Sequence, residues 1–169
     1  IKQKFSDLKD LKILISGDLL NGRTVHSFIQ ILKMYGCKVI LCPALIKNYL
    51  PWKSDTPIIN CLNLPPQYYE NQKILTPDDV NEVISEIDVF YMTRIQKERF
   101  EVSGKLDFFQ LNETNIDKVK QDAIILHPLP RNSEISEKID MDHRAAYHER
   151  QIRNGIYVRA SLLNYVLKE

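Results

Sequence analysis

The chain has 169 residues, and its 23 lysines and arginines nearly balance its 22 acidic residues, so the formal net charge is +1. Hydrophobic residues make up 44% and charged residues 27% of the sequence, a composition that excludes a disordered chain. No apolar run approaches the roughly 18 residues that a membrane helix needs. The balanced charge indicates neither a nucleic-acid nor a membrane partner.

The first part of the chain alternates between strand and helix patterns. Short apolar runs predict strands at 12–16 and 38–42, and a weaker strand at 58–62. A helix is predicted over 22–35, because apolar residues recur there at helical spacing and Gly36 follows as a stop signal.

The second part continues the alternation. A helix is predicted to start at 76–79, where Thr-Pro-Asp-Asp supplies an N-cap, a proline and acids in the first turn. Strands are predicted at 88–92 and 123–126, a short helix over 113–121 and a last helix from about 154 to 167. Strands that are apolar on both faces predict an α/β fold with a doubly wound, mostly parallel sheet and helices on both faces.

Three loops that follow predicted strands carry arginines. In a sheet of this class ligands bind beyond the carboxyl ends of the strands. The loops after 12–16, 88–92 and 123–126 supply Arg23, then Arg94 with Gln96, then Arg131. Because arginine binds carboxylates and phosphates through two parallel hydrogen bonds, the loops predict a site for a small, multiply charged anion. The alternative is that these arginines are merely solvated.

The first loop resembles a phosphate-binding loop but departs from that pattern. The stretch 17–24 has the spacing G-x4-G-x-T, with Arg23 where nucleotide-binding loops carry lysine. Arginine does not replace that compact cation, so nucleotide binding is not predicted. The helix that follows still offers free N–H groups to an anion.

The remaining candidates are histidines and prolines. His127 ends a predicted buried strand and is a candidate orienting residue, whereas His26 reads equally as a structural histidine. Pro128 and Pro130 stiffen the loop that follows, which is either a sharp turn or a rigid set of carbonyls that accept hydrogen bonds from a ligand. No catalytic triad, acid–base carboxylate pair or metal-ligand spacing is present, so no metal or cofactor is predicted.

Four stretches together resemble aspartate transcarbamoylases, and they span nearly the whole chain in the family's order. They are GRTVHS at 22–27, YMTRIQKER at 91–99, HPLPR at 127–131 and NGIYVR at 154–159. The resemblance is to the second, aspartate-binding half of this family, which has a Rossmann-like fold. It implies transfer of a carbamoyl group from carbamoyl phosphate to the α-amine of L-aspartate, in pyrimidine biosynthesis.

The resemblance also implies roles for individual residues. Arg23, Arg94 and Gln96 would bind aspartate, and the backbone carbonyls of Leu129 and Pro130 would bind the carbamoyl group and the attacking amine. The family's Leu-Pro bond at this place is typically cis. Five further residues would support the site: Thr24, Glu98, His127, Arg131 and Arg159. No acid–base residue is implied, because positioning and electrostatics supply most of the rate.

Further expectations concern the parts of the protein. Residues 1–148 would form the aspartate-binding domain, and 149–169 a helix that packs on a carbamoyl-phosphate domain that this chain lacks, with Ile1 at an interdomain boundary. The resemblance implies a cytoplasmic homotrimer. Two alternatives stay open: an ornithine transcarbamoylase-like enzyme, which a pair of arginines disfavours because ornithine is cationic, and a non-catalytic dicarboxylate-binding module.

Overall fold

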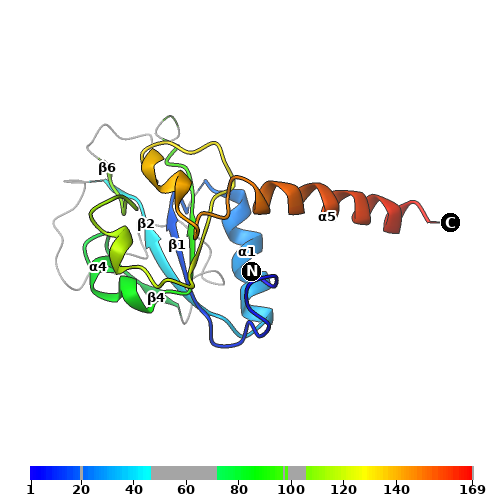
Figure 1. Cartoon of the computed structure of the whole chain (residues 1–169), viewed down its shortest axis with the longest axis horizontal. Helices are drawn as coiled ribbons and strands as arrows, with labels where there is room; N and C mark the ends of the chain where they lie inside the picture. The colour runs from blue at the N-terminus through cyan, green and yellow to red at the C-terminus, as the bar shows by residue number, and fades with distance from the viewer. Residues whose placement is uncertain (20, 47–71, 97, 99–105, 169) are drawn as a thin grey trace.

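The computed structural model describes residues 1–19, 21–46, 72–96, 98 and 106–168. Within these residues five strands form a parallel sheet in the order β4-β2-β1-β5-β7 (Figure 1). The strands are β1 Lys12–Gly17, β2 Lys38–Pro43, β4 Lys73–Ile74, β5 Val89–Met92 and β7 Ile124–Leu126. Four of them confirm predicted strands. The weaker prediction at 58–62 lies outside the described residues, and β4 was not predicted.

Side chains alternate between two apolar cores, one on each face of the sheet. On β1, Leu14 packs in the core beneath α4 (Val80–Val83) and the 3-10 turn η1 (Ile84–Glu86). Ile13 and Ile15 pack in the other core, beneath α1 (Arg23–Met34). Figure 1 shows α1 and α4 on opposite sides of the sheet. The predicted doubly wound α/β fold is therefore confirmed.

The order of the strands places a switch point between β1 and β5. From β1 the chain moves outward through β2 to β4, and it then returns to the other side of β1 for β5 and β7. Such a reversal is where parallel α/β sheets open a crevice for ligands. Gly17 closes the end of β1 with a φ of +118°, and a Cβ atom at this position would lie 2.2 Å from the backbone oxygen of Thr93. Only glycine allows the ends of β1 and β5 to approach so closely.

The predicted helix over 113–121 is wrong. The structure has only a 3-10 turn, η3 (Ile116–Lys118). Asn112 Oδ1 accepts the Thr114 N–H at 2.9 Å, and Asn115 Oδ1 accepts the Asn112 N–H at 2.9 Å. Asparagine side chains that bind nearby backbone groups compete with helix formation, which explains the difference.

The two remaining predicted helices differ from the structure at their boundaries. Thr76 and Asp79 exchange hydrogen bonds as a helix cap does, but regular helix covers only Val80–Val83. The last helix, α5 (Arg150–Val166), begins four residues before the predicted start at 154. Its first turn, Arg-Gln-Ile-Arg, favours a helix through intrinsic propensity and carries no apolar periodicity.

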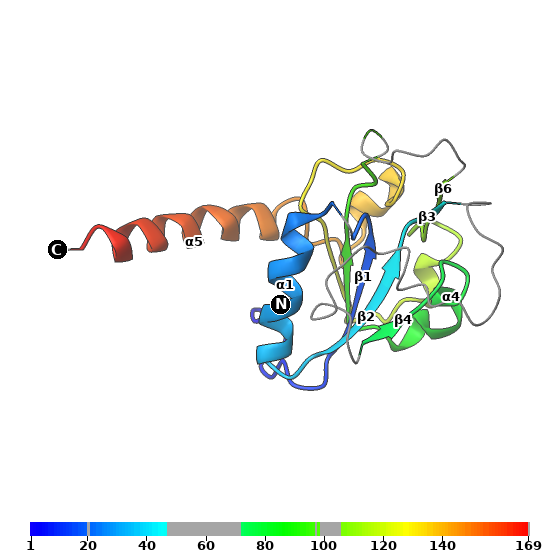
Figure 2. The ribbon, with the colours of Figure 1, turned by 180° about the vertical axis from the view of Figure 1, so that it is seen from behind.

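The helix α5 extends away from the rest of the described chain (Figure 2). It buries none of its side chains. Two smaller elements complete the described structure: the antiparallel pair of β3 (Leu45–Ile46) with β6 (Leu106–Asp107), and the 3-10 helix η4 (Glu137–Met141). No helix among the described residues is long and apolar enough to cross a membrane.

Two glycine variants test the close approach at the switch point. Gly17→Ala introduces a clash with backbone and a strained positive φ, so the free energy of unfolding should fall by at least about 2 kcal/mol. Gly155→Ala is the control, because nothing lies within 4 Å of its Cβ position on α5. Urea unfolding measures both variants. Equal stability of Gly17→Ala and the wild type would contradict this account of the β1–β5 junction.

Candidate active site

The loop that follows β5 presents Arg94 at the carboxyl edge of the sheet. Thr93 anchors the loop, since its N–H and its hydroxyl both donate to the Ser16 carbonyl, at 2.8 and 3.1 Å. Arg94 Nη2 donates to Glu98 Oε1 at 2.7 Å, and the Arg94 side chain stays 38% exposed. Gln96 lies between Arg94 and Glu98 in the sequence, and it is half-buried. Glu98 therefore orients a guanidinium that still faces solvent.

The loop that follows β1 leads directly into α1. Asp18 is buried, and its Oδ1 accepts the backbone N–H of Asn21 at 3.0 Å, which fixes the turn. Arg23 is then the first residue of α1 and is exposed. Burial raises the pKa of Tyr91, and a hydrogen bond with Thr24 offsets part of that rise. The structure thus places Arg23 at the start of α1 and ties the exposed Thr24 to Tyr91 of β5.

The loop that follows β7 has a backbone held by hydrogen bonds. Leu129–Pro130 is a cis peptide bond, as the resemblance implied, and Leu129 has a φ of +55°. The Leu129 N–H donates to His127 Nδ1 at 2.8 Å. His127 is buried, and its backbone N–H donates to Gln151 Oε1 on α5 at 3.0 Å. The loop is therefore held by the His127 ring on one side and by Gln151 of α5 on the other.

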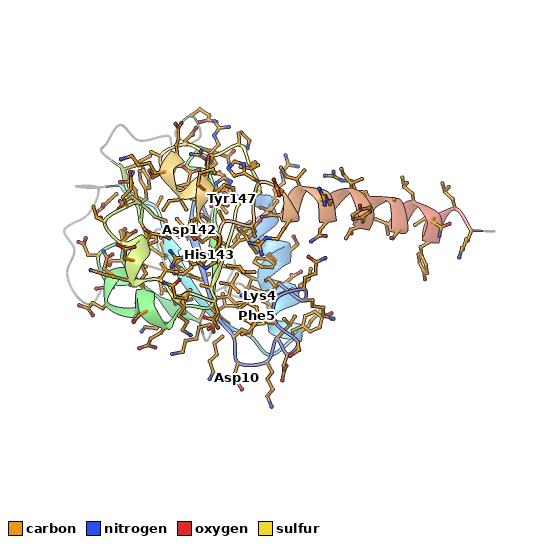
Figure 3. The ribbon with its side chains drawn as sticks, in the orientation of Figure 1. Lys4, Phe5, Asp10, Asp142, His143 and Tyr147 are labelled. Atoms are coloured by element: carbon orange, nitrogen blue, oxygen red, sulfur yellow. The ribbon has the colours of Figure 1, made fainter. Side chains whose placement is uncertain are left out.

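Arg131 follows this loop and turns into the body of the protein. Its guanidinium donates to the Ile135 carbonyl at 3.1 Å and to Asp140 Oδ2 at 2.5 Å. Tyr147, which is fully buried, donates its hydroxyl to Asp140 Oδ1 at 2.6 Å. Figure 3 labels Tyr147 near the start of α5. Arg131 therefore stabilises the base of the loop and does not point at an anion.

Asn132 links two of the three loops. In the amide orientation that satisfies both neighbours, its oxygen accepts from Arg94 Nε at 3.3 Å and its nitrogen donates to the Arg131 carbonyl at 3.2 Å. The β5 and β7 loops thus share a hydrogen-bonded contact. Since β1, β5 and β7 are neighbours in the sheet, all three loops lie at one edge.

The structure leaves one predicted residue on a separate element and adds others. Arg159 is exposed on α5, beyond the part of that helix that contacts the domain. Three residues that the sequence analysis did not select, Asn132, Glu134 and Asp140, hold the loop in place. The sequence signal that could have identified Glu134 is its position as an acidic residue in a polar stretch, three residues after Arg131.

The described residues contain no evident metal site. No group of three or more His, Cys, Asp or Glu side chains that could hold a metal ion occurs in the described part of the chain. His26 Nε2 lies 3.1 Å from the Leu19 carbonyl, and His143 Nε2 lies 2.8 Å from the Gln121 carbonyl, so both rings contact backbone. The polar groups that the described residues place at the edge are cations, amides and backbone carbonyls.

The fold and the three loops define an open parallel α/β domain whose edge at the switch point carries arginines and a proline loop. The chain belongs to the aspartate/ornithine carbamoyltransferase family: residues 9–166 match the model of its Asp/Orn binding domain. It is 38% identical to the aspartate carbamoyltransferase catalytic subunit of Picrophilus torridus over 99% of this chain and 52% of that protein. It is 41% identical to the subunit of Clostridium acetobutylicum over 92% of this chain and 49% of that protein.

Solved structures agree with these relatives. Aspartate transcarbamoylase from Trypanosoma cruzi in complex with aspartate and phosphate superposes with a TM-score of 0.72 at 30% identity. The match covers 96% of this chain and 49% of that chain. The chain therefore spans about half the length of the relatives it matches, namely their amino-acid-binding part.

The carboxylate of Asp140, which binds Arg131, predicts a pH dependence of the free energy of unfolding. Burial raises the pKa of Asp140, but hydrogen bonds from Tyr147 and His148 and the charge of Arg131 outweigh burial, so this pKa lies below its usual value of 3.8. A lowered folded-state pKa stabilises the protein above about pH 4 and loses that contribution as the pH falls. Asp140→Asn should therefore be less stable than the wild type by about 1–3 kcal/mol at pH 7, with a gap that narrows below pH 4.

Urea unfolding at pH 7 and pH 3 measures this gap. Asp122→Asn, at an exposed position in the same part of the chain, serves as the matched control and should differ little from the wild type at either pH. A gap between wild type and Asp140→Asn that is equal at both pH values would contradict the role of Asp140.

Proposed function

We propose that this chain supplies the aspartate-binding half of an aspartate carbamoyltransferase. One observation carries the proposal: Arg94, oriented by Glu98 and Asn132, lies at the same edge of the sheet as the fixed Leu129–Pro130 loop. A guanidinium recognises a carboxylate through paired hydrogen bonds. Backbone carbonyls recognise N–H groups, such as those of an amine and a carbamoyl group. The two features together suit an amino-acid dicarboxylate whose amine is to be carbamoylated.

The proposed reaction needs positioning more than proton transfer by a side chain. The neutral α-amine nitrogen of aspartate attacks the carbonyl carbon of carbamoyl phosphate, and the C–O bond to phosphate breaks. Phosphate leaves with the bonding electron pair, and the amine proton passes to it, which gives N-carbamoyl-L-aspartate and inorganic phosphate. Arg23, Arg94 and Gln96 would hold aspartate, while carbonyls of Leu129 and Pro130 would align the amine and the carbamoyl nitrogen.

Aspartate is favoured over ornithine by charge. The family model covers both substrates, so the choice depends on the residues at the edge. Arg94 and Arg23 attract a second carboxylate and repel the cationic side chain of ornithine. The relatives reported above carry the name aspartate carbamoyltransferase, which supports the same choice.

The domain boundary is also a proposal. Residues 1–148 would form the aspartate-binding domain, and 149–169 would pack on a carbamoyl-phosphate domain. The exposed apolar side chains of α5 support this, among them Ile156 at 60%, Leu163 at 61% and Val166 at 67% exposure. An exposed apolar surface on a helix indicates a surface that a partner covers. Gln3 and Asn154 exchange two amide hydrogen bonds, at 3.1 and 3.3 Å, and so tie the start of the chain to α5.

An activity assay tests the proposed function. We expect no carbamoyl aspartate from this chain alone, and turnover once it is joined to the first half of the Picrophilus torridus relative. Turnover by the chain alone would contradict the division of the site between two halves. Aspartate binding without turnover in the joined protein would favour the non-catalytic dicarboxylate-binding module. Light scattering of the joined protein tests the homotrimer, and the cytoplasmic location stays a prediction.

Arg94→Ala should weaken aspartate binding in the joined enzyme by about 2–5 kcal/mol, because a carboxylate loses its bidentate partner. Arg94→Lys should recover little, since an ammonium lacks the planar pair of donors. The aspartate KM and kcat/KM measure the loss. Lys118→Ala, an exposed cation on η3, is the control that should behave as the wild type. Unchanged aspartate kinetics in Arg94→Ala would refute the clamp.

Leu163→Asp tests the role of α5. Because Leu163 is exposed in the chain, the substitution should leave the free energy of unfolding of the chain within about 0.5 kcal/mol of the wild type. It should weaken association with a separately added carbamoyl-phosphate half, which sedimentation velocity detects. Association at wild-type strength would show that this part of α5 does not form the contact.

A further inference from the structure

Glu134 is a buried carboxylate that the proposed reaction does not use. Its side chain and that of His127 are both 0% exposed, and His127 Nε2 lies 2.9 Å from Glu134 Oε1. The same oxygen accepts the Asn132 N–H at 2.8 Å. Among the described residues Glu134 Oε2 has no hydrogen-bond partner. A buried, half-satisfied carboxylate costs free energy, so stability alone is a poor reason for its presence.

The hydrogen bonds of His127 define where its proton lies. The Leu129 N–H can only donate, so His127 Nδ1 must accept and carries no proton. The proton is therefore on Nε2 and is donated to Glu134. Burial raises the pKa of Glu134, but the hydrogen bonds from His127 and from the Asn132 N–H outweigh burial and hold this pKa below its usual range. Glu134 is thus an anionic acceptor at neutral pH.

The Leu129 amide is the link between this pair and the site. A peptide unit is planar, and in the trans form its N–H and C=O point in opposite directions. Fixing the Leu129 N–H on His127 therefore fixes the Pro128 carbonyl so that it points away from His127. Leu129 itself has a φ of +55°, a conformation that an L residue rarely adopts unless its surroundings hold it. One acceptor nitrogen thus fixes the peptide unit that directly precedes the Leu129 and Pro130 carbonyls.

We propose that Glu134 is a positioning residue: by accepting the proton on His127 Nε2, it keeps Nδ1 free for the Leu129 N–H and so holds the loop carbonyls in their working direction. This inference rests on the proposed function. Glu134 also holds the Asn132 N–H, and the Asn132 side chain contacts Arg94. One carboxylate therefore sets both the loop carbonyls and a neighbour of the aspartate clamp.

Substitution by glutamine and by alanine separates this role from simple packing. The Glu134→Gln amide can accept from Nε2–H, but it can also turn its NH2 group toward Nε2, which moves the proton to Nδ1 and sets it against the Leu129 N–H. Glu134→Ala removes the acceptor altogether. In the joined enzyme, corrected for the folded fraction, kcat should fall in the order wild type, Glu134→Gln, Glu134→Ala, by about ten- to a hundredfold for alanine.

The aspartate KM should change by less than about threefold in both variants, since Arg23 and Arg94 are not replaced and Glu98 still orients Arg94. Glu137→Gln is the matched control: it is the same change on an exposed carboxylate three residues away, and it should leave kcat and KM as in the wild type. A structural role alone would lower the folded fraction and leave kcat per folded enzyme unchanged, and that result would overturn the proposal.

A second measurement is independent of turnover. Nitrogen NMR of the chain labelled at histidine should show a protonated Nε2 and an unprotonated Nδ1 for His127, and Glu134→Ala should abolish this single tautomer. A protonated Nδ1 in the wild type, or an unchanged tautomer in Glu134→Ala, would overturn the proposal. If the joined wild-type enzyme makes no carbamoyl aspartate, the proposed function fails. The NMR result still decides whether Glu134 sets the His127 tautomer that accepts the Leu129 N–H.

Discussion

The parallel pairing of β5 between β1 and β7 determines where the loops of the candidate site lie. Each of these strands is buried on both faces, so the apolar cores fix their register and bring their carboxyl ends to one edge. Gly17 permits the close approach of β1 to the end of β5 at Thr93. Because the three loops begin at this edge, polar groups that lie far apart in the chain become neighbours.

Buried polar contacts then convert three loops into a defined surface. Asp18 fixes the first loop, the Ser16 carbonyl fixes the second through Thr93, and His127 with Glu134 fixes the third. These contacts cost desolvation, and they order groups that would otherwise sample many conformations. Guanidinium and carbonyl groups that are already oriented before a ligand arrives lose less entropy when it binds, which is the physical basis of catalysis by positioning.

Strong local patterns made the core of the fold predictable. The apolar runs around Ile13 and Phe90 could only be buried strands, and the arginines after them followed from the geometry of parallel sheets. The two-residue strand β4 carries too little pattern to be recognised, and side chain–backbone hydrogen bonds at Asn112 and Asn115 replaced a predicted helix. Asn132, Glu134 and Asp140 were missed because their roles arise from tertiary contacts, whereas the resemblance identified the residues expected to touch the substrate.

We infer that the edge formed by β1, β5 and β7 binds the dicarboxylate. A crystal structure of this chain joined to a carbamoyl-phosphate half, grown with N-(phosphonacetyl)-L-aspartate, a ligand seen with the Trypanosoma cruzi enzyme, tests it most directly. We expect the guanidinium groups of Arg23 and Arg94 to bind the aspartate carboxylates, and the carbonyls of Leu129 and Pro130 to face the ligand's amide nitrogen. A ligand bound away from these three loops would contradict it.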